Sequence, residues 1–230
     1  MKRNTVYGLL FFVATMTIFS ACKKNDYLIG GSLNKAKVNM TTYDYLKNDP
    51  QHLFDTLIML VDAAGLKDSI NQPGITFFAP TDYSIDNYLY EKTVQEQNVN
   101  IFAKYTIDTL IKYDIDSFKY YIGEYIVHTP LNFNNLKATG TQFETGNDTT
   151  YSVVSYEPTH DPYLGFYSAV NTPPNIVYYT LLSHRIIGAF DAQQFTKSDG
   201  VKTRVQTFGI LTTTGTLGVL GNEHMLYFEY

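Results

Sequence analysis

The sequence predicts an α+β fold in one domain, with helices first and strands after them. In the first half, apolar residues such as Leu53, Leu57, Leu60 and Ala64 repeat at helical spacing. Beyond Leu131, short β-branched and aromatic runs alternate with Gly, Asn, Asp and Pro clusters, which is typical of strands joined by tight turns. This order predicts N-terminal helices packed on an antiparallel β-sandwich or wedge.

The first 21 residues predict a secretory signal peptide. Lys2 and Arg3 precede an uncharged, mostly apolar run over residues 6–19. As a helix this run is about 21 Å long at roughly 1.5 Å per residue, which is short of the ~30 Å hydrocarbon core of a bilayer. The run is therefore typical of a signal peptide and not of a membrane span.

The small residues before Cys22 resemble a bacterial lipobox. The resemblance implies cleavage before Cys22 and a diacylglycerol group on its thiol, which would attach the mature chain to a membrane. Phe19 stands where a lipobox usually has leucine, and the alternative is an ordinary signal peptide that contains a cysteine. Residues 22–40 are then a flexible polar tether, and residues 41–230 form the domain.

The helices are expected in the first half of this domain. Thr41 or Thr42 caps a short helix, and the Asp49-Pro50 pair starts a second one that ends near Gly65. An apolar strand from Ile75 stops at Pro80. Further helices are expected after this stop, around residues 103–113, and from residue 116 or 117 to residue 126.

The strands are expected in the second half, where they form an antiparallel meander. Their ranges are 150–157, 175–182, 184–190, 201–211, 216–220 and 224–230.

The stretch "ITFFAPTDYSI", with Phe78, Ala79, Pro80, Thr81 and Asp82, resembles the signature of fasciclin domains. Weaker resemblances flank it in the right order: "LFDTLIMLVDAAGLKDSI" before it and "GILTTTGTLGVLGNEHMLYF" near the end. Together they run from about residue 41 to residue 228. The resemblance implies a fasciclin-like domain with a role in adhesion or interaction.

The chain departs from the fasciclin pattern at two places. The family's second signature places Tyr and His side by side, whereas here Ile126 follows Tyr125 and the histidine is His128. Gly218 stands where a histidine is common in the closing segment. Adhesion residues of the family therefore cannot be transferred to this chain. Lipobox and tether together resemble lipoproteins of the Bacteroidetes type, which implies an outer-membrane lipoprotein facing the periplasm or the cell surface.

The Pro-Thr-Asp corner is expected to be framework and not an active-site elbow. Pro80 cannot donate to a sheet ladder, so the strand ends there. Thr81 or Asp82 can then accept a hydrogen bond from a free amide in the first turn of the following helix.

Residues with catalytic or metal-binding chemistry form no recognisable constellation. The five histidines lack metal-site spacing and are expected on the surface or in turns; they are His52, His128, His160, His184 and His224. The sequence therefore predicts no catalytic residue, no metal site and no cofactor. Without Lys2 and Arg3 the chain has a net charge of about −7, which disfavours nucleic acid as a partner.

Twenty tyrosines and no tryptophan are the unusual part of the composition. Tyr163, Phe166 and Tyr167 gather in an expected loop, which makes them the candidate binding surface. The alternative is that these rings fill the core. Thr149, in the polar loop "ETGNDTTY", resembles an O-glycosylation site of Bacteroidetes.

The sequence predicts a module without catalytic activity, held at the envelope by lipid on Cys22. It would bind an extracellular or envelope protein, a matrix component or a glycan. Two alternatives are an accessory subunit of an outer-membrane nutrient (glycan) uptake complex and a polysaccharide hydrolase with distant carboxylates.

Overall fold

The computed structural model describes residues 37–167, 169 and 171–229. The chain divides into two units, Met1–Asn34 and Lys35–Tyr230, and the described residues all belong to the second. Cys22 and the expected signal peptide lie outside the described residues. In the part that is described, no helix is long and apolar enough to cross a membrane.

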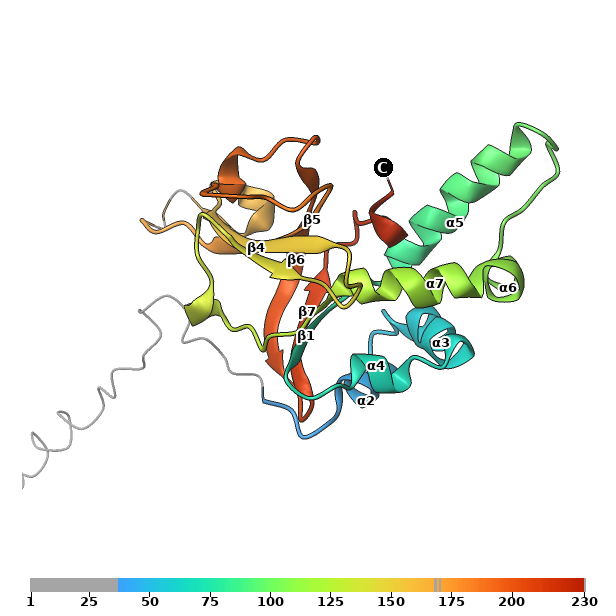
Figure 1. Cartoon of the computed structure of the whole chain (residues 1–230), viewed down its shortest axis with the longest axis horizontal. Coiled ribbons are helices and arrows are strands. Elements are labelled where there is room, and N and C mark those ends of the chain that lie inside the picture. Colours follow the sequence, from blue (N-terminus) through green and yellow to red (C-terminus); the bar gives the residue numbers. More distant parts are fainter. Residues whose placement is uncertain (1–36, 168, 170, 230) are drawn as a thin grey trace, which may run out of the picture. The chain divides into compact units, whose positions relative to one another are not determined.

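Helices make up the first half of this unit, as expected. They gather on one side of the strands (Figure 1). Their bounds are α2 Thr42–Lys47, α3 Asp55–Ala64, α4 Lys67–Ile70, α5 Asp82–Gln97, α6 Ile107–Thr109 and α7 Ile115–Tyr121. A π-helical segment, Leu110–Asp114, joins α6 to α7, and a 3-10 turn, Ile122–Tyr125, follows α7.

Two of the expected helix boundaries are wrong. The second helix begins at Asp55 and not at Asp49-Pro50, because the carboxylate of Asp49 accepts a hydrogen bond from the Leu53 amide at 3.0 Å within a separate turn. The two helices expected over 103–113 and 116–126 form one continuous helical run. Asp114, the last residue of the π-helical segment that joins them, accepts a hydrogen bond from the Tyr105 hydroxyl.

The strands of the described residues form one seven-stranded sheet in the order β2-β1-β7-β6-β5-β4-β3. Their bounds are β1 Ile75–Ala79, β2 Ile126–Val127, β3 Thr141–Glu144, β4 Tyr151–Pro158, β5 Asn175–Leu182, β6 Gly200–Leu211 and β7 Gly215–Leu220. The expected antiparallel meander is confirmed from β4 to β7. The expected sandwich or wedge is not confirmed: these strands share one sheet, and β1 runs parallel to β7, so the sheet is not purely antiparallel.

The sheet curves until its two edges meet. β2 and β3 are the edge strands, and Val127 nevertheless forms an antiparallel bridge with Thr145, just after β3. The Gly146 amide also donates to the Ile126 carbonyl at 2.9 Å. At this seam a Cβ on Gly123 would lie 3.0 Å from the backbone of Gly146, so the close approach depends on glycine. The result is a nearly closed barrel.

Two segments expected as strands are not strands. Residues 184–190 form an irregular loop that contributes Ile186 and Phe190 to a small second cluster around Val153 and Leu182. The last segment forms a 3-10 turn, Leu226–Phe228, whose side chains are buried.

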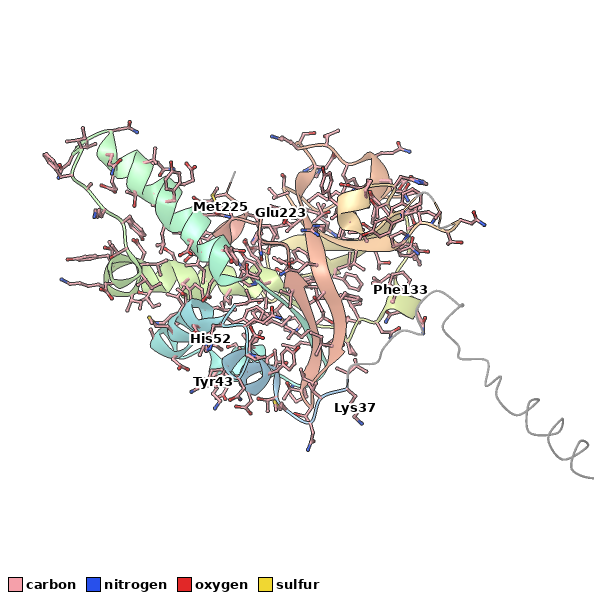
Figure 2. The ribbon with its side chains drawn as sticks, turned by 180° about the vertical axis from the view of Figure 1, so that it is seen from behind. Lys37, Tyr43, His52, Phe133, Glu223 and Met225 are labelled. Atoms are coloured by element: carbon pink, nitrogen blue, oxygen red, sulfur yellow. The ribbon has the colours of Figure 1, made fainter. Side chains whose placement is uncertain are left out.

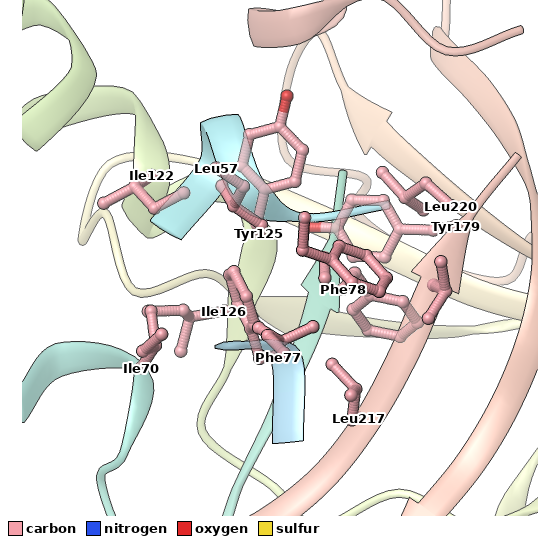
Figure 3. Packing of buried hydrophobic residues seen from close by; sticks show 14 of the residues in the cluster. Leu57, Ile70, Phe77, Phe78, Ile122, Tyr125, Ile126, Tyr179, Leu217 and Leu220 are labelled. Carbon is pink, nitrogen blue, oxygen red and sulfur yellow. The ribbon is translucent and has the colours of Figure 1, made fainter. Parts of the chain in front are cut away.

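The main core lies between the helices and the inner face of the sheet (Figure 3). It contains Leu57 from α3, Phe77 and Phe78 from β1, Tyr125 and Tyr179, all with no exposed surface. Aromatic rings meet there at short distances, with 4.5 Å between the ring centroids of Phe78 and Tyr179. The described unit therefore has a hydrophobic core of its own.

Candidate functional site

The Pro-Thr-Asp corner lies inside the fold and joins two helices. Phe78, Ala79 and Thr81 have no exposed surface, and Pro80 is buried as well. Asp82 begins α5, but its carboxylate accepts hydrogen bonds from the amides of Thr56 at 2.9 Å and Leu57 at 3.0 Å, in the first turn of α3. The N-cap residue of α3, Phe54, has no side chain that can do this. Asp82 therefore caps α3 from outside.

The cap expected from Thr81 is absent. Thr81 occupies the N-cap position of α5 without a side-chain capping bond. Its hydroxyl instead donates to Asn222 Oδ1 at 3.1 Å, and Asn87 of α5 donates to the carbonyls of Asn222 and His224. The corner thus uses its hydrogen-bonding groups to fix distant chain segments.

A buried tyrosine–histidine pair lies beneath this corner. Tyr125 and His224 have no exposed surface, and their Oη and Nε2 atoms are 2.9 Å apart. The Tyr125 hydroxyl also accepts the Tyr227 amide at 2.8 Å, while Thr203 Oγ1 lies 3.5 Å from His224 Nδ1. Burial lowers the pKa of His224 to about 3, so the imidazole is neutral at physiological pH. The pair is positioned to hold the C-terminal turn.

His224 corrects the expectation for the histidines. The other four are exposed as expected, whereas His224 is in the core. The cause is the C-terminal turn, which buries Leu226, Tyr227 and Phe228 and carries His224 inward with them. The aromatic residues that follow His224 are the only sequence signal for this position, and they also fit the strand that was expected there.

Glu124 is a buried carboxyl beside the same pair. Its exposed fraction is 5%, and the hydroxyl of Tyr179 donates to its backbone carbonyl. Burial raises the pKa of Glu124 to about 7. This residue belongs to the 3-10 turn at the seam of the sheet, next to Gly123.

A surface groove lies beside the seam. It has a volume of about 290 Å³ and is lined by Leu66, Ser69, Gln72, Lys119, Tyr120, Ile122, Gly123, Ile126, His128, Gly146 and Asn147. Its only charged lining residue is Lys119, which is paired with Asp116 at 3.0 Å. In the described part of the chain, no group of three or more acidic, histidine or cysteine side chains is placed to hold a metal.

The candidate binding surface is on the loop between β4 and β5. Tyr163 is 97% exposed and Tyr167 is 65% exposed, whereas Phe166 is half-buried with its ring 4.8 Å from that of His160. Hydrogen bonds hold the first part of this loop: Asp161 accepts the Tyr163 amide at 2.9 Å, and the Thr159 amide donates to the Pro174 carbonyl at 2.9 Å. Tyr163 and Tyr167 are thus exposed on a segment that its own hydrogen bonds hold, which we call the aromatic loop (residues 159–167).

Neighbouring rings from the same stretch of sequence are in the core, as the alternative expected, and a binding role for Tyr163, Phe166 and Tyr167 stays a prediction. Tyr179 is fully buried and Tyr178 is half-buried. Thr149 is exposed in the turn between the seam and β4.

Comparison with known proteins gives a likeness to solved structures but none to family models or curated sequences. No family model matches the chain, and no curated protein is similar to it at the level of sequence. A solved structure described as a FAS1 domain pair from the insect cell adhesion molecule fasciclin I is similar, with 15% identity and a TM-score of 0.45. The match covers 78% of this chain and 47% of the other, so the chain spans about half its length. A likeness this weak leaves function to be argued from the chain's own surfaces.

Proposed function

We propose that this protein is a fasciclin-like binding module of the cell envelope that acts by adhesion and not by catalysis. A lipid on Cys22 would hold it at the outer membrane, facing the periplasm or the cell surface. Its partner would be an extracellular or envelope protein, a matrix component or a glycan.

The observation that supports this proposal is the pair of solvent-facing rings on the aromatic loop. Exposed tyrosines bring a large apolar surface and a hydroxyl to a contact and lose little conformational freedom on binding. Tyr163 and Tyr167 are presented by a segment in which the amides of Thr159, Tyr163 and Phe166 already have hydrogen-bond acceptors. Little ordering is therefore required when a partner binds.

The polar groups at the buried corner and beneath it form hydrogen bonds within the chain. His224 and Tyr125 hold the C-terminal turn, and Asp82 caps α3. Their hydrogen bonds join segments of the chain, which favours a framework role for them and a recognition role for the exposed loop.

Binding is tested with the unit of residues 35–230 on arrays of glycans and matrix proteins. The double variant Y163S/Y167S should lose at least tenfold in affinity for whichever partner is found, at unchanged thermal stability. The matched control is Y90S/Y113S, which removes two other exposed tyrosines from the helical side, where Tyr90 is 67% and Tyr113 is 70% exposed. No binding across the arrays, combined with turnover of a polysaccharide, would reverse the proposal in favour of a hydrolase.

Anchoring is tested on the full chain by intact-mass measurement of the protein made in a bacterial envelope. The expected mass is that of residues 22–230 plus the lipid on Cys22. A further mass of sugar that disappears in the variant T149A would assign the glycan to Thr149. Retention of residues 1–21 without lipid would refute the anchor.

A further inference from the structure

Helix α5 is packed at its beginning and exposed at its end. Its buried residues, Ser84, Ile85 and Tyr88, all belong to its first half. The helix has 16 residues, or about 24 Å at roughly 1.5 Å per residue. Figure 1 shows that α5 and the loop that leads to α6 extend beyond the other helices.

Three large apolar side chains are exposed on this loop. Val99 is 92% exposed, Ile101 is 73% exposed and Phe102 is 88% exposed. We call these three residues the apolar tip. Single exposed apolar residues are ordinary on protein surfaces, but three within four positions form a local patch that is typical of an interaction site.

The backbone of the apolar tip is fixed by its own hydrogen bonds. The amides of Val99 and Asn100 both donate to the Glu96 carbonyl at 3.0 Å. Asn100 then accepts the Phe102 amide through its side chain at 3.1 Å and the Ala103 amide through its carbonyl at 2.8 Å.

The base of the loop is tied to α5 in the same way. Thr93 Oγ1 donates to the Tyr105 carbonyl at 3.2 Å and accepts the Tyr105 amide at 3.0 Å. The fold therefore holds three exposed apolar side chains on an ordered loop. Because the loop backbone is already ordered, binding costs little conformational entropy there.

The size and charge of the tip indicate what covers it. Three such side chains offer roughly 400 Å², about half of the ~800 Å² that each partner contributes to a standard protein interface. A bilayer requires no surface of complementary shape, so a small projecting apolar patch is enough for insertion. In the sequence that flanks the tip, residues 91–104, Glu91 and Glu96 are matched by Lys92 and Lys104, and Lys92 is paired with Glu229 at 3.6 Å, so no excess of positive charge favours anionic lipid.

We propose that the apolar tip is a membrane-contact site that inserts Val99, Ile101 and Phe102 into the interface of a zwitterionic bilayer. The contact is separate from the lipid on Cys22. Figure 2 shows Lys37, where the described unit begins, on the opposite side of the unit from the end of α5. The tip thus provides a second contact with a bilayer that needs neither the anchor nor the aromatic loop.

The test uses residues 35–230, which contain the whole described core and lack both Cys22 and the signal peptide. Because the chain has no tryptophan, the variant F102W carries a single tryptophan at the tip, whose emission is excited selectively over that of the tyrosines. Its emission should shift to the blue when phosphatidylcholine vesicles are added. In flotation, the vesicle-bound to free ratio of the unit should fall at least tenfold in the variant V99S/I101S/F102S.

The control is Y163S/Y167S/I187S, which removes three exposed side chains of similar size from other loops. It should float like the parent unit, and it also separates this test from that of the aromatic loop. Equal loss in both triple variants, an unshifted F102W spectrum, or binding that requires phosphatidylglycerol would overturn the proposal. A blue shift that grows with protein concentration without vesicles would assign the tip to a second copy of the chain instead.

Discussion

Tyr179 and Tyr163 belong to the same hairpin and have opposite surroundings. Tyr179, on β5, has no exposed surface, donates its hydroxyl to the Glu124 carbonyl and packs against Phe78 and Phe228. Tyr163, on the loop that leads into β5, is 97% exposed. The number of tyrosines is therefore a poor guide to a binding surface.

The buried tyrosines and the exposed tyrosines differ in the hydrogen bonds that their hydroxyls make. The hydroxyls of Tyr125 and Tyr179 are bonded to chain segments far away in sequence, so these rings join the C-terminal turn and the seam to the sheet. In the aromatic loop, by contrast, the backbone amides are hydrogen-bonded to Asp161 and Pro174, and the hydroxyls of the exposed rings take no part in these bonds. Changes in the first group should cost stability, and changes in the second should cost binding alone.

The largest effect is expected for Tyr179→Ala. The substitution removes a fully buried ring and the donor to the Glu124 carbonyl, which should lower the free energy of unfolding by about 3–5 kcal/mol. Urea unfolding of residues 35–230, followed by circular dichroism, measures this. A loss below 1 kcal/mol would contradict the packing described for the core.

Glu124→Gln should reveal a pH dependence of stability. With the pKa of Glu124 raised to about 7 by burial, the folded state keeps the proton at pH values where the unfolded state has lost it. The contribution of the protonated Glu124 carboxyl to the free energy of unfolding is complete below pH 4.5 and disappears as the pH rises through 7. Its upper limit is about 3 kcal/mol. Relative to the parent, the variant should be more stable at pH 8.5 and unchanged at pH 4.5. The exposed Glu91→Gln is the control, and a parallel offset at both pH values would refute the assignment.

Tyr125→Phe tests the buried hydroxyl without changing the ring. Loss of this group leaves the Tyr227 amide and the His224 imidazole without their shared partner, at an expected cost of about 2 kcal/mol. Hydrogen exchange of the Tyr227 amide should accelerate at the same time. Tyr120→Phe, which removes a hydroxyl from a half-exposed ring, should leave both quantities unchanged.

Asp82→Ala tests the cap that α5 provides for α3. Two amides in the first turn of α3 lose their acceptor, and the unfolding free energy should fall by about 1–2 kcal/mol. Asp86→Ala, at an exposed position of the same helix, should change it by less than about 0.5 kcal/mol. Equal effects of the two variants would mean that charge, and not the cap, is responsible.

The smallest effect on stability is expected for Tyr163→Ser. A side chain that is 97% exposed has little packing to lose, so the change should stay within about 0.5 kcal/mol. Thermal unfolding measures this against Tyr179→Ala. A cost similar to that of the buried ring would mean that the aromatic loop is part of the framework.

Local patterns predicted the elements whose neighbours lie close in sequence. The helix over Thr42–Lys47, the end of α3 at Gly65 and the strand Asn175–Leu182 all follow from periodicity, capping and turn chemistry. The same patterns failed where packing overrides local preference. Tyr227 and Phe228 have a strand-like composition but adopt φ values of 65° and 56°, because the turn buries their rings.

The candidate sites were predictable only in part. Exposure of Tyr163 and Tyr167 follows from their place between two strands, but the burial of Tyr179 in the same stretch depends on the whole sheet. The pairing of Tyr125 with His224 spans 99 residues and has no local signal. The apolar tip was missed because Val99, Ile101 and Phe102 have the composition of a core segment, and only the structure shows that nothing within the described unit covers them.

The pairing of β1 with β7 has a consequence for the order of synthesis. Ile75 pairs with Gly215, so a strand translated in the first half of the domain has its parallel neighbour only when the last strand emerges. Until then β1 and β6 each lack a partner that the finished sheet gives them. A nascent chain that stalls before Gly215 would expose the unpaired backbone groups of two strand edges. Such a chain is prone to aggregate and would require chaperones to remain soluble.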